Sequence, residues 1–496
     1  MSRRRFRKLL PLVTTLVLIL PLLLALAAPV SAATVTVCPA GPPTCDYATI
    51  TLAVAGETYP VIINVYPDTY NESVNLYKAS GWDITLRGLN ASGTVTVDGS
   101  GTPAFYTSSQ HSGNITIEGF TVKSTSSHGI HVHVNSDVVI RDVIANGTGS
   151  SGVRVQGASG NVTVEDCTAN DNDEDGFDLD DIDGNLTVTR CTANNNGYEN
   201  FDIYIIGGNV TITNSTANRS QSDEGFLIDD IAGNVEITGC TANDNDEDGI
   251  YVNIAGDLLI TNCTANGNGE SGFDPERVEG TVTIKACIAR DNDSGVDLDA
   301  LEDADALLVN GNIICGNECG VGLWSDITDL NLEGNWWGCD GGPEAAGCDP
   351  ICQRDSIPAD STPWIDTVTA SAPASVIVGE PAIVSFQFSG GPPAVYLGEG
   401  PGDLHGDPTF IVTTDNGTVT GGFINAPHGV MEVTLVPQTE GTATVTVVGP
   451  CGLDEQIVLG VQAAAADFVP EPGSVMLLAS GLMGLAGYAG LRMRKR

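Results

Sequence analysis

The chain has 496 residues, more than one ordinary domain holds, and its formal net charge is −43. Nine of its 20 lysines and arginines lie at the two ends, within residues 3–8 and 492–496, so the part between them is more acidic still. Polyanion binding needs clustered lysine and arginine side chains. These numbers therefore exclude nucleic acid as an expected partner and favour divalent cations.

Residues 1–33 have the three parts of a secretory signal peptide: a basic start, an apolar stretch from Leu9 to Ala28, and small residues before an expected cut near Ala33. An uncleaved membrane anchor is the alternative. Export would place the 13 cysteines where disulfides can form, although the sequence does not fix their pairing. Residues 34–59 are expected to form an N-terminal cap, with a short amphipathic helix within residues 46–56.

Six consecutive segments between residues 160 and 290 repeat one pattern, of which GNVTVEDCTANDNDEDGFDLDD is the first copy. An anchor residue, serine in the third copy (Ser215) and cysteine in the other five, recurs every 23 to 25 residues. Apolar and polar residues alternate in short runs, and Gly, Asn and Asp clusters separate the runs. The period and the alternation predict an all-β parallel β-helix over residues 60–364, with coils of about 24 residues stacked about 4.8 Å apart.

Two sets of repeated residues are expected to be structural. The anchor cysteines should form a buried stack, because their spacing matches no zinc site. One asparagine per repeat should form a ladder of amide hydrogen bonds. The cysteines are Cys167, Cys191, Cys240, Cys263 and Cys287, and the asparagines are Asn170, Asn194, Asn218, Asn243 and Asn266.

Both ends of the repeat region carry further motifs: a P-x-T-Y turn at residues 67–70, and N-W-W-G at 335–338 followed by Gly342-Pro343 and Pro363-Trp364. Together with the repeats, they resemble right-handed parallel β-helix proteins of the pectate-lyase-like superfamily. The resemblance implies a fold and no particular reaction.

The pattern changes after residue 365. Residues 366–462 read as about seven short alternating strands, which predicts a small immunoglobulin-like β-sandwich, and residues 463–468 read as a linker. Residues 469–496 contain Pro470-Glu471-Pro472, an apolar stretch over 475–491 and a basic end. This order resembles the PEP-CTERM sorting signal.

Carriers of the PEP-CTERM signal are processed by an exosortase-type enzyme. The resemblance implies secretion through the inner membrane, transient insertion of the C-terminal segment into that membrane, and a final place in the bacterial envelope, outer surface or extracellular matrix. An unprocessed C-terminal anchor is the alternative.

Strand alternation predicts one outward face paved with carboxylates. The expected binding residues on it are Asp178, Asp180, Asp202, Tyr204, Asp229, Tyr251, Asn253, Asp274, Glu276, Asp297 and Asp299. Ca²⁺ is the expected cofactor, because hard cations bind carboxylate oxygens and relieve their repulsion. The expected metal ligands are Asp178, Asp202, Asp171, Asp173 and Asp175. A solvated acidic face that only maintains solubility is the alternative.

From this pattern we expect a secreted protein that binds an envelope or extracellular polysaccharide and Ca²⁺ without catalysis. The alternative is a polysaccharide lyase or hydrolase acting on an acidic or neutral envelope glycan. Its candidate catalytic residues are Arg154, His131 and Asp180.

Overall fold

The computed structural model describes residues 32–463, with gaps at 59, 80, 91–92, 299–300, 302–303, 324–329, 340–341, 344, 354–367, 389–410, 426–429 and 449–454. Residues 1–31 of the predicted signal peptide and the whole of the predicted sorting signal lie outside these residues. Within them, no helix is long and apolar enough to span a membrane. The predicted cap helix is α2 (Ile50–Gly56), whose N-cap Thr49 accepts a hydrogen bond from the backbone N–H of Leu52.

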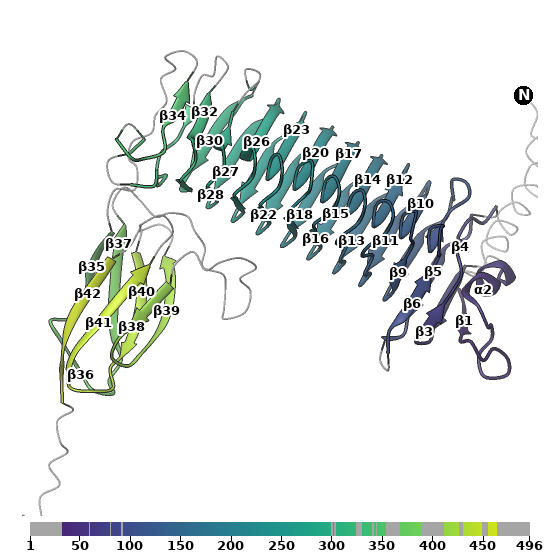
Figure 1. Cartoon of the computed structure of the whole chain (residues 1–496), viewed down its shortest axis with the longest axis horizontal. Helices are drawn as coiled ribbons and strands as arrows, with labels where there is room; N and C mark the ends of the chain where they lie inside the picture. The colour runs from purple at the N-terminus through teal and green to yellow at the C-terminus, as the bar shows by residue number, and fades with distance from the viewer. Residues whose placement is uncertain are drawn as a thin grey trace, which may run out of the picture.

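Two long parallel sheets, A and C, run the length of the solenoid, and a shorter parallel sheet B covers its C-terminal part (Figure 1). Sheet A has 13 strands. In chain order they are β1 (Ala33–Val37), β2 (Val61–Val65), β5 (Ile84–Gly88), β8 (Ile115–Glu118), β11 (Val138–Arg141), β13 (Val162–Glu165), β15 (Leu186–Thr189), β18 (Val210–Thr213), β21 (Val235–Thr238), β24 (Leu258–Thr261), β27 (Thr281–Lys285), β30 (Ala306–Asn310) and β33 (Leu330–Asn331). Sheet A therefore begins before residue 60.

Sheet C has 12 strands and carries the predicted acidic face. They are β4 (Val74–Asn75), β7 (Phe105–Tyr106), β10 (Ile130–His133), β12 (Val153–Gln156), β14 (Phe177–Ile182), β17 (Phe201–Ile206), β20 (Phe226–Ile231), β23 (Ile250–Ile254), β26 (Ser271–Val278), β29 (Ser294–Asp297), β32 (Cys319–Leu323) and β34 (Ile351–Gln353).

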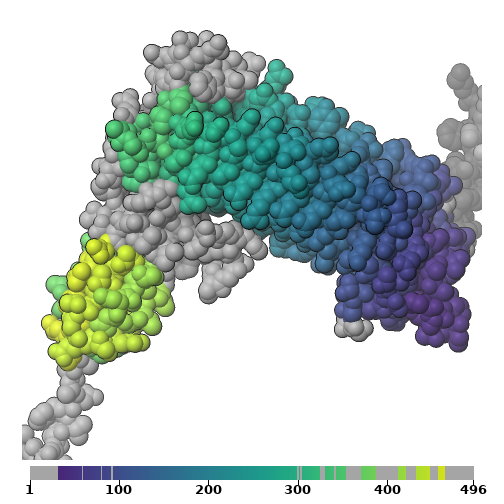
Figure 2. Space-filling view, in the orientation of Figure 1, coloured from purple at the N-terminus to yellow at the C-terminus, as the bar shows by residue number. Residues whose placement is uncertain are grey.

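Sheet B has six strands, and a three-stranded sheet precedes it at the N-terminal end. Sheet B consists of β16 (Thr192–Asn194), β19 (Thr216–Asn218), β22 (Thr241–Asn243), β25 (Thr264–Asn266), β28 (Ile288–Arg290) and β31 (Ile313–Cys315). The smaller sheet consists of β3 (Asp68–Tyr70), β6 (Val95–Asp98) and β9 (Thr121–Lys123). Figure 2 shows the stacked coils as one continuous rod.

The interior is built from identical residues stacked coil upon coil. Phe177, Phe201 and Phe226 pair in register, and their rings are stacked with centroids 4.9 and 4.7 Å apart. The anchor cysteines are free thiols and are each 1 % exposed, which confirms the predicted buried stack. The predicted asparagine ladder is also present, because the Oδ1 atoms of Asn170, Asn194, Asn218 and Asn243 each accept the backbone N–H of the asparagine one coil further along.

A second, buried asparagine ladder lies at the turn before sheet C. Each of these residues donates its backbone N–H and Nδ2 to the Oδ1 of the next, from Asn172 to Asn196 and from Asn245 through Asn268 and Asn292 to Asn317. A glycine follows in most coils, because a Cβ at Gly176 or Gly225 would lie 2.8 or 2.6 Å from the Nδ2 of the next coil's asparagine.

One coil replaces the ladder asparagine with Ser220, and Asn200 compensates for it. Asn200 stands where the other coils have glycine. Its Oδ1 accepts from the Nδ2 of Asn196 (2.8 Å), and its own Nδ2 donates to the Oδ1 of Asn245 (3.1 Å). The smaller Ser220 leaves the space that this side chain fills. The amide ladder is therefore continuous across the substitution.

The C-terminal strands form two four-stranded sheets, consistent with the predicted small β-sandwich. One sheet contains β35 (Val368–Ser371), β37 (Ala382–Phe388), β40 (Val430–Val436) and β39 (Thr418–Asn425). The other contains β36 (Ser375–Ile377), β42 (Glu455–Gln462), β41 (Gly441–Val448) and β38 (Ile411–Thr414). Disulfides join Cys38 to Cys45, Cys319 to Cys352 and Cys339 to Cys348.

The ladder makes a specific prediction about stability. Asn200→Gly leaves one N–H of the Asn196 amide buried without a partner, which costs about 1–3 kcal/mol of unfolding free energy. Adding Ser220→Asn recreates the arrangement of the neighbouring coils, so the double variant should regain most of that loss. Thermal unfolding followed by circular dichroism measures both. Equal destabilisation of the single and the double variant would contradict this account of the ladder.

Candidate functional site

The outward face of sheet C brings together most of the predicted site residues. Backbone pairing places the side chains of one column on successive coils, as predicted: His131, Arg154, Asp178, Asp202, Leu227, Tyr251 and Asp274. A second column runs beside it, through His133, Gln156, Asp180, Tyr204 and Asp229. Successive side chains therefore lie about 4.8 Å apart along the rod.

The far end of the second column differs from the prediction. A register shift in β26 pairs Asn253 with Arg277, so Glu276 does not occupy the predicted place. Glu276 instead accepts a hydrogen bond from the hydroxyl of Tyr251. Simple alternation missed the extra residue of this bulge. Asp297 lies in β29, next to β26 in sheet C. Asp299 lies outside the described residues.

A further column of carboxylates, the turn column, lies in the turns that precede the central strands of sheet C. Each member stands two residues before the first inward residue of its strand. Its members are Asp175, Glu199, Glu224 and Asp248, with Ser151 before them and Ser271 after them. Of these residues, only Asp175 was predicted to belong to the site. The others sit in turns, and strand alternation does not assign turn residues to a face. Asp175 and Asp248 are buried, and Ser151 donates to Asp175 over 3.0 Å.

Burial raises the pKa values of two carboxylates in the column that begins at His131 and of carboxylates in the turns before the strands. It brings the pKa of Asp178 to about 7, even though Arg154 acts in the opposite direction. It also brings the pKa of Asp202 to about 7, with the charges of Asp175 and Asp180 adding to the effect. Burial likewise raises the pKa of Glu224 and Asp248 to about 7. Keeping these carboxylates ionised therefore costs free energy along this edge of the sheet.

The N-terminal end of the face has a different chemistry. Arg154 Nη1 lies 2.9 Å from Asp178 Oδ2, and the rings of His128 and His131 meet edge to face with centroids 4.8 Å apart. Burial, together with His128 and Arg154, lowers the pKa of His131 to about 4. The imidazole of His131 is therefore neutral at pH 7. His128 is a member of this group that the sequence reasoning did not single out.

An exposed aromatic side chain interrupts the carboxylates near the middle of the face. Tyr204 is 40 % exposed and pairs with Asp180 on one side and Asp229 on the other. Tyr198, 49 % exposed, lies in the turn of the same coil. An aromatic ring flanked by hydrogen-bond acceptors suits a sugar ring, which has apolar C–H faces and a rim of hydroxyl groups.

Among the described residues, one group of three carboxylates has oxygens close enough to share a cation. Its members are Glu199, Asp223 and Glu224, with ligand atoms within 4.8 Å of one another. None of the five predicted ligands belongs to this group. Asp171 is exposed and has a left-handed backbone, and Asp178 is paired with Arg154. Carboxylate oxygens fit a hard cation such as Ca²⁺, and the Ca²⁺ site remains a prediction.

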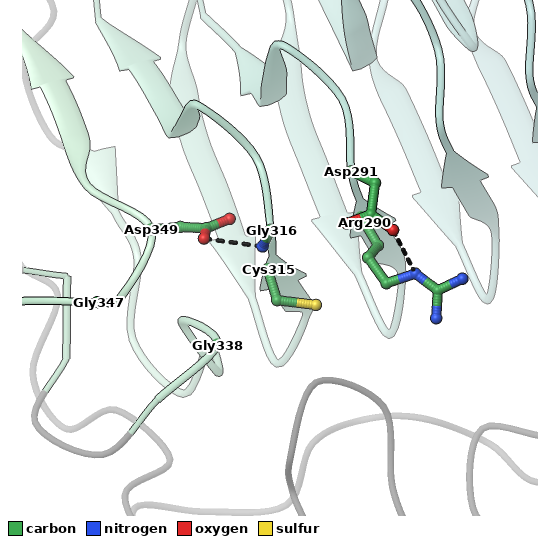
Figure 3. Close-up of a pocket in the computed structure, with 7 residues that line it drawn as sticks. All are labelled: Arg290, Asp291, Cys315, Gly316, Gly338, Gly347 and Asp349. Atoms are coloured by element: carbon green, nitrogen blue, oxygen red, sulfur yellow. Dashed lines mark hydrogen bonds and ion pairs between the residues drawn. The ribbon is translucent and has the colours of Figure 1, made fainter.

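A separate cavity of about 500 Å³ lies near the C-terminal end of the solenoid, lined by Arg290, Asp291, Cys315, Gly316, Gly338, Gly347 and Asp349 (Figure 3). Its charged groups are already engaged. Arg290 pairs with Asp291 over 3.1 Å, and Asp349 accepts from the backbone N–H groups of Gly316 and Asn317. Asp349 therefore ends the buried asparagine ladder, and we interpret the cavity as structural.

Comparison with known proteins identifies two regions of the chain. Residues 93–220 and 199–336 match the family model for a right handed beta helix region, and residues 468–495 match the PEP-CTERM protein-sorting motif. Both predicted resemblances are confirmed at this level. The search of curated proteins gave no match.

Several solved structures are similar to this chain. Pectate lyase Pel9A is 15% identical over 68% of this chain and 80% of its own, with a TM-score of 0.35. A rhamnogalacturonan lyase is 13% identical over 67% and 87%, with a TM-score of 0.34. The mannuronan C-5 epimerase AlgE4 A-module of Azotobacter vinelandii is 16% identical over 64% and 92%, with a TM-score of 0.37. At such scores we draw nothing from them about the site.

The raised pKa values predict how stability depends on pH. An Asp202 pKa of about 7, above its ordinary 3.8, means that the folded state binds the proton more tightly than the unfolded chain does. This contribution to stability is complete below about pH 4 and is lost as the pH rises through 7. Asp202→Asn should therefore raise the melting temperature at pH 8 and change it little at pH 4.

The gain at pH 8 has an upper limit of about 1.4 kcal/mol for each unit of pKa shift. The matched control is Asp171→Asn, which removes an exposed carboxylate in a turn of the same solenoid and should have little effect at either pH. Thermal unfolding at pH 4 and pH 8 provides the measurement. A melting temperature for Asp202→Asn at pH 8 below that of the wild type would show that Asp202 stabilises the fold as an anion.

Proposed function

Because residues 93–336 form a right-handed β-helix region and residues 468–495 a PEP-CTERM protein-sorting motif, we propose that the chain is an exported cell-surface or matrix protein that binds polysaccharide. In this proposal the polymer lies along the outward face of sheet C, and an exosortase-type enzyme processes the C-terminal segment. The observation that carries the proposal is the open face of sheet C, where Tyr204 stands between carboxylates on neighbouring coils.

The shape of the face supports a polymer over a small molecule. The side chains repeat at every coil, so a chain of similar sugar units laid along the rod meets similar groups at each step. Carboxylates accept hydrogen bonds from sugar hydroxyls, and the rings of Tyr198 and Tyr204 offer apolar surface. Each contact is weak, and affinity comes from many of them acting together.

Calcium is part of the proposal. Glu199, Asp223 and Glu224 would share one Ca²⁺, and Asp178 and Asp202 stand together in the neighbouring column. A bound cation would replace the repulsion between stacked carboxylates with attraction and would leave coordination positions open for sugar hydroxyls. Binding only to the folded state would also stabilise the chain by mass action.

The test is a binding screen of the exported chain against immobilised polysaccharides, with Ca²⁺ and with a chelator. Tyr204→Ala should weaken binding about tenfold or more, because truncating an aromatic side chain that anchors an interface costs about 2 kcal/mol or more. Tyr66→Ala is the control, since Tyr66 is 44 % exposed but directly follows sheet A strand β2. Equal loss of binding in both variants, or no binding to any glycan, would refute the proposal.

A second candidate function is cleavage or modification of the bound glycan. The observation that favours it is the cluster of Arg154, His131 and Asp178 at one end of the face, because shifted pKa values gather at catalytic sites. A neutral imidazole accepts a proton, and a carboxyl group with a pKa of about 7 donates one. This candidate is a lyase or hydrolase for which the rest of sheet C holds the polymer.

Product analysis separates the two candidates. Under the binding proposal, each polysaccharide that binds stays intact on long incubation. Shortened or unsaturated oligosaccharides that disappear in His131→Ala, while Tyr204→Ala only slows their formation, would establish the second candidate. Tyr66→Ala again serves as the control, with no effect expected on product formation.

A further inference from the structure

The outward face of sheet A differs in charge from the rest of this acidic chain. Its strands carry three basic outward side chains, those of Arg87, Arg141 and Lys285, and three acidic ones, those of Glu118, Glu165 and Glu236. The face therefore has no formal net charge, whereas the whole chain has −43. Two copies of so acidic a protein repel each other through most of their surface, and sheet A is a long face on which this repulsion is absent.

Four of these charges alternate in sign along one column of sheet A. Backbone pairing places them on successive coils, in the order Arg87, Glu118, Arg141, Glu165. No bulge interrupts the register of this sheet from β1 to β18. The outward column beside them is uncharged on the same four coils and consists of Thr85, Thr116, Val139 and Thr163. The charges therefore stand on a regular surface of small side chains.

Within one chain the four charged side chains already contact one another. Arg87 pairs with Glu118, and the Nε of Arg141 lies 2.7 Å from a carboxylate oxygen of Glu165. The two arginine side chains are still 47 % and 41 % exposed. Exposed ion pairs add little to stability, so stability alone does not account for the alternation. The pairs do hold the side chains in place, and each arginine retains N–H donors for a second carboxylate.

A column of four alternating charges is complementary to itself when it is reversed. In an antiparallel pair of rods, with the two-fold axis between the coils of Glu118 and Arg141, these two residues of each copy face each other. In the same arrangement Arg87 of each copy faces Glu165 of the other. Sliding one copy by a single coil in either direction brings like charges together. The column therefore favours one register and disfavours its neighbours.

We propose that sheet A is the interface of a homodimer in which two solenoids pack face to face and antiparallel. In this register the eight strands from β1 to β18 overlap. With strands about 4.8 Å apart and about 13 Å long, the two copies together bury about 1,000 Å². This area is at the lower limit for a specific interface, so the dimer dissociates reversibly.

The dimer goes beyond the proposed function without depending on it. Sheets A and C are different faces of the rod, so a dimer through sheet A leaves sheet C of both copies open. If sheet C binds polysaccharide, such a dimer holds two polymer chains, or two parts of one chain, and binds with the avidity of two sites.

Charge reversal tests the interface, with sedimentation equilibrium of the exported chain as the measurement. Arg141→Glu makes Glu118 of each copy face a carboxylate, and Glu118→Arg makes Arg141 face a guanidinium. Each variant alone should raise the dissociation constant of the dimer about tenfold or more. An equimolar mixture of the two variants should dimerise as the wild type does, because every facing pair is again opposite in charge. Lys285→Glu is the matched control, since Lys285 lies in β27, beyond the overlap.

The double variant Glu118→Arg/Arg141→Glu separates the interface from the ion pairs within one chain. It restores opposite charges across the dimer but places like charges on neighbouring coils of its own column. It should therefore dimerise as the wild type does and have a lower melting temperature. A role of the column in the stability of one chain alone predicts the lower melting temperature without any dimer.

The remaining outcomes also decide the matter. A wild-type chain that stays monomeric at every concentration, or a dimer whose dissociation constant does not rise with salt, overturns the interface and leaves glycan binding untouched. A mixture of folded single variants that fails to dimerise overturns it as well, as does a loss of dimer in Lys285→Glu equal to that in Arg141→Glu. Recovery in both the mixture and the double variant establishes the antiparallel dimer.

Discussion

In-register parallel stacking is the constraint on which the rest of this molecule depends. Each side chain meets the same position of the next coil, about 4.8 Å away. Inside the rod this favours stability, because phenylalanine rings stack on phenylalanine rings and each asparagine amide bonds to the next. On the outside the same rule places carboxylate beside carboxylate, as Asp178 stands beside Asp202. The electrostatic repulsion that this stacking produces is therefore concentrated on sheet C.

The protein lowers that repulsion without removing it. Arg154 neutralises Asp178, Ser151 donates to Asp175, and the backbone N–H of Ser271 donates to Asp248. Even so, the pKa values of Asp178, Asp202, Glu224 and Asp248 are raised to about 7. Repulsion of this kind, retained along one face of an otherwise regular solenoid, is typical of a surface that a ligand completes. Stability and the proposed ligand binding therefore depend on the same residues.

Much of the fold followed from the repeat period, because a fixed spacing and strict alternation assign every strand residue to a face. The outward facing of Asp178, Asp202 and Asp274 and the burial of the anchor cysteines were predicted correctly for this reason. The glutamates of the turn column were missed, because turn residues have no alternating pattern. Asn253 pairs with Arg277 and not with Glu276 because of a bulge in β26, which the sequence pattern does not reveal. His128 and Asn200 gain their roles only from neighbours one or two coils away.

The central claim is that a polysaccharide lies along the outward face of sheet C. Hydrogen–deuterium exchange of the exported chain, with and without a polysaccharide that binds, tests this most directly. The account predicts that slower exchange on binding is concentrated in β14, β17, β20 and β23 and in the turns that precede them. Slower exchange confined to sheets A and B or to the C-terminal strands, with sheet C unchanged, would contradict it.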